Sequence, residues 1–200
     1  MTSPEASPKA LCYLRMIVAL LQDDLNTLQR WEKQCLMEFY PEKCPLLLVT
    51  NKPNVIQEYY AIHGHTVKPT DTAKYLGVEL HNHLSWQKHI HNTARKTDAT
   101  CAFLHRNMRG CLRDTRPQCY STLIRPIMDY ASTIWEPHTQ KDMDCLEKTQ
   151  RRSAVFVYQY FRRTSSVTNM MTQLGWESLA ERHAKTKVTM ASCASQYGAT

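Results

Sequence analysis

The chain has 200 residues, of which 42% are hydrophobic, and it carries a formal net charge of +7. A chain of this size and composition can bury one medium-sized core or two small ones, so we expect it to fold. It contains only five glycines, and long stretches lack both Pro and Gly, which argues against a β-sandwich or a barrel. We expect an α+β fold that is mostly helical.

The excess positive charge lies in the second part of the chain. Residues 1–81 hold eight Lys and Arg against nine Asp and Glu, a net charge of −1, whereas residues 82–200 hold 17 against nine, a net charge of +8. A basic half of this kind is typical of a surface that faces nucleic acid. A solvated basic surface without a partner accounts for the charge equally well.

Cysteine spacing and hydropathy bear on the cellular compartment. The eight cysteines include no C-x-x-C pair, so reduced thiols fit better than a zinc site or a disulfide framework. The N-terminus lacks a basic segment followed by an apolar run, and no window approaches the roughly 20 apolar residues of a membrane span. We therefore expect an intracellular protein, cytoplasmic or nuclear, that is neither secreted nor membrane-spanning.

The first elements in chain order are a disordered segment and a long helix. Residues 1–14 open with a polar stretch that contains two prolines and offers little to bury, so we expect no order there. Apolar residues at three- and four-residue steps then predict a helix from Met16 to about Phe39, ended by Pro41. The residues of this stripe, expected to be buried, are Met16, Ile17, Leu20, Leu21, Leu25, Leu28 and Trp31.

Three short apolar runs follow, separated by turn-forming residues. They are Leu46–Thr50, Gln57–His63 and Tyr75–Leu80, and they predict a small antiparallel sheet. With the long helix, this sheet makes up a first region, residues 15–81.

The next region, residues 82–190, has the pattern of a helical bundle. Ser85 is a candidate N-cap for a helix that ends near Gly110. A second helix begins near Asp114 and closes at Pro137, with a kink or break at Pro126. The inward positions of these two helices are expected to be Ile90, Ala94, Thr97, Cys101, Leu104, Tyr120, Leu123, Ile124, Ile127, Ala131 and Ile134.

Three further helices complete the predicted bundle. One runs from about Lys141 to Phe161, and a short one begins near Val167 and ends at Gly175, a natural C′ residue. The segment Ser178–Glu181 is a capping box that opens a last basic helix, and residues 191–200 are expected to fray. The inward positions of the longer helix are expected to be Met143, Leu146, Gln150, Ala154, Val157 and Phe161.

Few residues suggest catalysis or metal binding. The sequence contains no G-x-S-x-G, P-loop or H-E-x-x-H motif. Asp23 and Asp24 are of the type that holds metal ions in polymerases, but they lie within a predicted helix, which favours a solvated helix face. The pairs His63/His65, His81/His83 and His89/His91 could be drawn as metal ligands, and surface histidines explain them as well.

The basic residues of the second region are the better candidates for a binding surface. On a helical bundle they would face phosphates, with Tyr120, Tyr158 and Tyr160 interleaved. The candidate nucleic-acid-binding residues are Lys88, Arg95, Lys96, Arg106, Arg109, Arg125, Arg151 and Arg152, and further basic positions are Arg113, Arg116, Lys148, Arg162 and Arg163.

Several segments occur in the order and spacing of a known enzyme family. They are Leu21–Trp31, Met37–Cys44, Ala73–Val78, Leu84–Trp86, Tyr120–Ser132 and Gln150–Ala154. Together they closely resemble the region that follows the catalytic hairpin in reverse transcriptases of non-LTR (LINE-type, jockey-like) retrotransposons. The resemblance covers about Leu20 to Met190.

The resemblance implies a palm remnant in residues 15–81 and a helical thumb with its continuation in residues 82–190. Lys74, Tyr75, Leu76 and Gly77 would form a primer-grip-like segment beside the primer terminus. The basic thumb helices would track the phosphates of an RNA/DNA duplex.

The family's activity is RNA-directed DNA polymerisation, with Mg²⁺ held by aspartates that precede this region. Met1–Leu20 contains no aspartate, so the resemblance implies a truncated fragment of a mobile element, without catalytic residues and without a cofactor as it stands. We expect at most residual nucleic-acid binding. The alternatives are a small helical protein-interaction module derived from such a fragment, or a relic without function.

Overall fold

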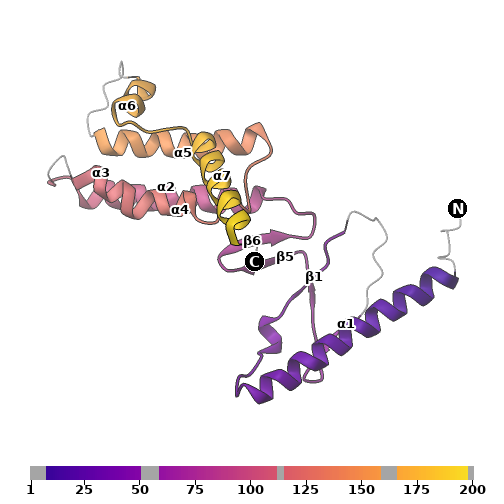
Figure 1. The fold of residues 1–200 in the computed structure, drawn as a ribbon. Helices are drawn as coiled ribbons and strands as arrows, with labels where there is room; N and C mark the ends of the chain where they lie inside the picture. Colours follow the sequence, from indigo (N-terminus) through magenta and orange to yellow (C-terminus); the bar gives the residue numbers. More distant parts are fainter. Residues whose placement is uncertain (1–7, 51–58, 112–114, 159–165, 198–200) are drawn as a thin grey trace, which may run out of the picture. The chain divides into compact units, whose positions relative to one another are not determined.

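The computed structural model describes residues 8–50, 59–111, 115–158 and 166–197 (Figure 1). The chain divides into two compact units, which we describe separately. The first comprises Met1–Ala73 with His81–Leu84, and the second comprises Lys74–Leu80 with Ser85–Thr200. The fold is α+β and mostly helical, as the composition predicts.

The first unit begins with α1 (Pro8–Gln34), which is longer at its start and shorter at its end than expected. Helix is present from Pro8, where we expected disorder up to residue 14. The helix ends before Phe39 because Leu36 adopts a left-handed conformation, with φ of 54°. The amide of Met37 then donates to the carbonyl of Glu32 at 3.1 Å, a Schellman-type closure that needs no proline.

The apolar stripe of α1 is less buried than the pattern predicts. The exposed fractions of Leu20, Leu28 and Trp31 are 60%, 48% and 46%. The expectation of a buried stripe is therefore wrong for these residues, while Leu25 is half-buried. A hydrophobic period identifies one face of a helix, but burial of that face requires a partner element.

Two polar contacts hold the rest of the first unit to α1. The side chain of Gln22 accepts from the amide of Ala61 and donates to its carbonyl, both at 3.0 Å. The Glu32 carboxylate, 2% exposed, accepts from the amide of Phe39 and lies 2.9 Å from Nε2 of His63. These contacts satisfy polar groups at the helix surface and fix the following segments against it.

Among the described residues of the first unit, the strands form separate pairs, and the expected three-stranded antiparallel sheet is not present. After a 3₁₀ turn, η1 (Pro41–Lys43), β1 (Leu46–Leu47) pairs in parallel with β4 (Pro69–Thr70). The strands β2 (Ala61–Ile62) and β3 (His65–Thr66) pair antiparallel. Residues 57 and 58 of the expected second strand lie outside the described residues.

The expected strand Tyr75–Leu80 is interrupted by a turn. It is divided between β5 (Thr72–Tyr75) and β6 (Val78–His81), which pair with each other. Leu76 and Gly77 at the turn have φ of 45° and 84°, the left-handed geometry of a tight hairpin. The turn packs in the second unit, where the hydroxyl of Tyr130 donates to the carbonyl of Leu76 at 2.7 Å.

The second unit is built on α2 (Gln87–Asn107) and α5 (Gln140–Tyr158), which pack side by side (Figure 1). The cap position before α2 is Trp86, so the prediction that Ser85 caps this helix is wrong. All five positions predicted to face inward on α2 are buried, with Ile90 and Thr97 at 0% exposure. The four apolar ones join a hydrophobic core that includes Val78, Ile124, Met128, Trp135, Leu146, Phe156 and Leu179.

The predicted break near Pro126 is present as a change of helix type. Short α3 (Thr115–Cys119) passes into a π-helical turn, η2 (Tyr120–Ile124), and then into α4 (Arg125–Asp129). Proline lacks the amide that would continue regular α-helical bonding, which accounts for the irregular turn before it. The helix ends at Asp129, well before Pro137.

Burial along this segment follows the predicted stripe only in part. Tyr120 and Ile124 are buried, but the expected burial of Leu123 and Ile134 is wrong, since they are 49% and 59% exposed. Leu123 lies within the π turn, which departs from the regular α-helical period, and Ile134 lies beyond Asp129, where the helix has already ended, so an α-helical period marks neither position correctly.

Both predicted caps near the C-terminus are present. Helix α6 (Val167–Gln173) is followed by Gly175 with φ of 64°. In the capping box before α7 (Leu179–Tyr197), the amide of Glu181 donates to the Ser178 hydroxyl, and the amide of Ser178 donates to the Glu181 carboxylate. The helix continues to Tyr197, past Ala191, where we expected regular structure to end.

Candidate nucleic-acid interface

The basic residues predicted to bind nucleic acid are exposed in the second unit. Helix α2 carries four of them, Arg109 follows that helix, α4 carries Arg125, and α5 carries two, with Lys148 beside them. The eight candidate residues, all exposed, are Lys88, Arg95, Lys96, Arg106, Arg109, Arg125, Arg151 and Arg152. We call the exposed basic side chains of α2 and α5 the basic face.

Three of the four basic residues of α2 fall close to one line along the helix. Lys88 and Arg106 are separated by 18 residues, which is five full α-helical turns, so they point in the same direction about 27 Å apart. Arg95 lies between them, within about 20° of that direction. The sole acidic residue of α2 is Asp98, so the helix carries four basic side chains against one acidic one.

Contacts between α2 and α5 define a seam at the edge of the basic face. His91 Nδ1 lies 3.9 Å from Cys145 Sγ, and further along both helices Asp98 lies 2.5 Å from Nη1 of Arg152. Nearer the helix ends, the ring of His105 meets the ring of Phe156 edge-on at 6.3 Å. Residue numbers rise together on both sides, so the two helices run parallel, and basic residues of both border the seam.

Arg116 corrects one sequence expectation. We grouped it with phosphate-facing residues, but it is 2% exposed. Its guanidinium donates to the carbonyls of Phe156 at 3.1 Å and Met108 at 2.7 Å and lies over the Phe156 ring. Arg116 therefore ties α3 to α5 and to the end of α2, and it is not available to a ligand.

Arg125 and Tyr120 also have contacts within the fold. Arg125 is exposed, but its Nε pairs with Asp129 at 3.1 Å, and Arg182 pairs with the same carboxylate at 2.8 Å. Tyr120 stacks on Trp176 at 3.7 Å between ring centroids, and burial raises its pKa. Both expected roles at a nucleic-acid surface are thus weakened. Arg113, Tyr160, Arg162 and Arg163 lie outside the described residues.

The primer-grip-like residues Lys74, Tyr75, Leu76 and Gly77 form the tip of the β5–β6 hairpin. The side chains of Tyr75 and Leu76 are 67% and 72% exposed. A Cβ at Gly77 would stand 3.4 Å from the Tyr130 ring, so the backbone of the turn lies close against that side chain.

The acidic and histidine pairs occupy different environments. Asp23 and Asp24 are exposed on α1. His81 and His83 stack at 5.5 Å, whereas His89 is buried against Trp135, and burial lowers its pKa. Within the described ranges, no group of three or more His, Cys, Asp or Glu side chains is placed to hold a metal ion.

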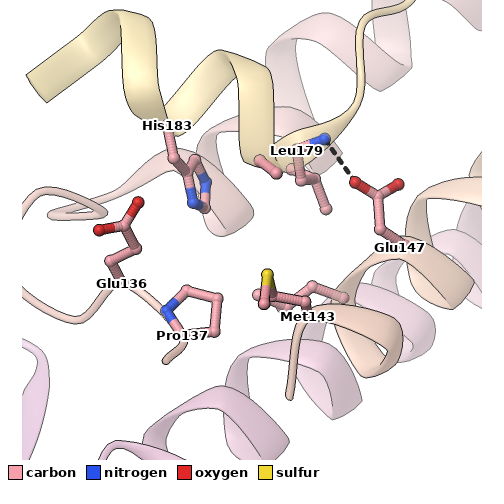
Figure 2. Close-up of a pocket in the computed structure, with 8 residues that line it drawn as sticks. Glu136, Pro137, Met143, Glu147, Leu179 and His183 are labelled. Atoms are coloured by element: carbon pink, nitrogen blue, oxygen red, sulfur yellow. Dashed lines mark hydrogen bonds between the residues drawn. The ribbon is translucent and has the colours of Figure 1, made fainter. Parts of the chain in front are cut away.

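A small cavity of about 30 Å³ lies among α5, α7 and the segment before α5 (Figure 2). His183, Glu136, Pro137 and Met143 border it, and Glu147 accepts from the amide of Leu179 at 2.7 Å. His183 is 2% exposed, and burial lowers its pKa. A cavity of this size has room for about one water molecule, so it is not a substrate site.

The interface contains residues that the sequence analysis missed. Asp98 and His105 border the seam, and Ala102 lies beside them. The available signal was their four- and three-residue spacing along one side of α2, next to the basic line. Their partners on α5 lie about 50 residues away, so this signal alone did not identify the seam.

No protein-family model, curated protein or solved structure matches this chain. Among the helices of the described part, none is long and apolar enough to cross a lipid bilayer. The fold and surface define the chain as a mostly helical α+β protein with a basic two-helix face.

Proposed function

We propose that this chain is a reverse-transcriptase-like fragment that binds nucleic acid duplexes, RNA/DNA hybrids among them, through the basic face of α2 and α5, without polymerising. The observation that carries this proposal is the line of Lys88, Arg95 and Arg106 along one side of α2. Its length of about 27 Å is comparable to most of a helical turn of duplex. Cations aligned on one side of a helix can meet phosphates of a backbone without reading the base sequence.

The proposed binding is electrostatic, so it has a defined salt dependence. Each phosphate neutralised contributes a slope of about −0.9 to the logarithm of affinity against the logarithm of salt concentration. If Lys88, Arg95, Lys96 and Arg106 all contact phosphates, the slope is about −4. The affinity should depend little on base sequence.

The test is a salt series with a fluorescent RNA/DNA hybrid, with circular dichroism to confirm folding. The variant Arg95→Gln with Arg106→Gln is expected to weaken binding and to reduce the slope by about two. The matched control, Lys33→Gln with Lys68→Gln, removes the same charge from exposed positions of the first unit and should leave binding nearly unchanged. If both double variants weaken hybrid binding equally, the binding reflects only the general attraction of nucleic acid to a basic protein.

Two other results would contradict the proposal. A folded chain that does not bind the hybrid at low salt would overturn the binding function. Primer extension by the purified chain with Mg²⁺ or Mn²⁺ would overturn its non-catalytic part, because polymerisation requires clustered metal ligands.

The second candidate is a protein-interaction module, favoured by apolar surface in the first unit. A cavity of about 360 Å³ there is lined by Leu21, Leu25, Leu28, Phe39 and Ile62, among others. Helix α1 also exposes Leu20 and Trp31, and apolar surface of this kind suits an apolar helix of a partner protein. A monomer with little binding of a hydrophobic dye would count against this candidate, and Leu28→Glu should lower the dye signal if the face is open.

A further inference from the structure

A shallow groove lies at the C-terminal end of the seam between α2 and α5. Its volume is about 370 Å³, and its lining includes Ala102, His105 and Arg106 from α2 and Arg152 and Phe156 from α5. This volume is at the lower end of the range for small-molecule sites. The groove continues the basic face, since two of its lining residues belong to that face.

The lining combines an apolar floor with cationic borders. Phe156 is 2% exposed, and its ring contacts both the buried guanidinium of Arg116 and the ring of His105, an exposed residue. Ala102 adds a small apolar side chain at an exposed position, which leaves space above the floor. Arg106 and Arg152 stand at the borders, and the side chain of Arg152 is 65% exposed.

We propose that this groove receives an unpaired base of a bound nucleic-acid strand, so the preferred ligand is a duplex with a single-stranded extension. The inference rests on the proposed function of the basic face. An unpaired base presents a flat, largely apolar surface that stacks on aromatic rings or on guanidinium planes. His105 and Arg152 provide these two kinds of plane, and the phosphates on either side of the base would meet Arg106 and Arg152.

Charge and continuity favour this occupant. The groove carries two arginines and lies at the end of the line of cations that is proposed to follow a phosphate backbone, so a strand on that line reaches the groove. Asp98 reduces the positive charge at one border because it pairs with Arg152. Bases in an intact duplex are stacked and paired, so they cannot enter a groove of this kind without disruption of the duplex.

The test compares three fluorescent probes with the full chain: a blunt RNA/DNA hybrid, the same hybrid with a short single-stranded extension, and the same hybrid with an abasic extension. We expect the chain to bind the extended hybrid about tenfold more tightly than the blunt one. The abasic extension adds the same phosphates without bases, so it should restore little of this preference.

Two variants locate the preference in the groove. Ala102→Leu fills the groove without a change of charge, and His105→Ala removes the exposed ring. Both should abolish most of the preference for the extended hybrid while blunt-hybrid binding remains. Ala184→Leu, the same substitution at an exposed position of α7, is the matched control and should keep the preference.

The outcomes separate the two proposals. Equal binding of blunt and extended hybrids would overturn the groove inference while the basic face stands. A full preference for the abasic extension, or a preference that survives both groove variants, would also overturn it. Absence of binding to every probe would overturn the proposed function itself, and the groove inference with it.

Discussion

Arg152 of α5 reaches across the seam to Asp98 of α2, with Nη1 2.5 Å from Oδ2. This pair joins the two helices of the basic face and places a carboxylate, 33% exposed, among its cations. An exposed ion pair of this kind contributes about 0–1 kcal/mol to stability. Its larger effect is expected on binding, because Asp98 competes with phosphate for the Arg152 guanidinium.

Asp98→Asn is therefore expected to raise the affinity for a nucleic acid hybrid and to steepen the salt slope by about one. The change removes the one acidic side chain of α2 and releases Arg152 for a phosphate. A salt series by fluorescence anisotropy measures both quantities. Asp23→Asn, at an exposed position of α1, makes the same change of charge elsewhere and should have little effect. A lower affinity of the Asp98 variant would contradict the proposed interface.

Arg116 and Arg106 are expected to show opposite effects when each is replaced by Met. Arg116→Met removes the guanidinium that donates to the carbonyls of Phe156 and Met108, so it should lower the free energy of unfolding by about 2–4 kcal/mol. Arg106→Met, at an exposed position, should change it by no more than about 0.5 kcal/mol and should weaken hybrid binding instead. Urea unfolding followed by tryptophan fluorescence gives the first quantity. If Arg116→Met unfolds at the wild-type urea concentration, its buried role is refuted.

The stability of the second unit should fall as the pH drops below about 6.5. His89 and His183 flank the buried Trp135 at 5.0 and 5.6 Å. Burial is the main cause that lowers the pKa of both histidines below the ordinary value of 6.5. Lys74 lowers the pKa of His89 further, and Arg182 lowers that of His183 further. Glu79 and Asp129 raise them in part.

The direction follows from proton linkage. Between the unfolded and folded pKa values the unfolded chain binds more protons, so the free energy of unfolding rises with pH in that window. The part of the free energy of unfolding that depends on the two neutral histidines is fully present above about pH 6.5. It is lost as the pH falls toward the folded pKa values, by at most about 1.4 kcal/mol per pH unit for each histidine. His89→Gln and His183→Gln should each reduce this slope in urea unfolding at a series of pH values. If the double variant keeps the same dependence of the free energy of unfolding on pH, other titratable groups cause this dependence.

Substitutions at the two adjacent residues of the turn between β5 and β6 are expected to change the free energy of unfolding in opposite directions. Gly77 has φ of 84°, so Gly77→Ala should lower the free energy of unfolding by about 1–2 kcal/mol. Leu76 has φ of 45° and is 72% exposed. Because Asn tolerates this conformation and little apolar burial is lost, Leu76→Asn should raise the free energy of unfolding by up to about 1 kcal/mol. Gly110→Ala is the control, because a Cβ there meets nothing within 4 Å and no left-handed φ is required. Thermal unfolding of the three variants measures the effects, and stabilisation by Gly77→Ala would contradict the hairpin geometry.

Several features follow from the sequence alone because their causes act within one or two helical turns. The capping box at Ser178 needs only a hydroxyl and a carboxylate three residues apart, and Gly175 ends α6 because it adopts a left-handed conformation at little cost. The irregular turn before Pro126 follows from the missing amide of proline. The buried stripe of α2 was predicted correctly because a polar, basic face lies opposite it, which leaves one choice of inward direction.

Other features were decided only by tertiary structure, since they depend on residues far apart in the chain. Arg116 resembles its basic neighbours in sequence, and it is buried because the carbonyls of Met108 and Phe156 converge on it. The stripe of α1 has the period of a buried face, yet Leu20 and Trp31 stay exposed because no described element covers them. The sequence thus determined most of the helices, the caps at Gly175 and Ser178 and the location of the positive charge. The seam between α2 and α5 arose from packing, because contacts across about 50 residues leave no periodic signal in a single chain.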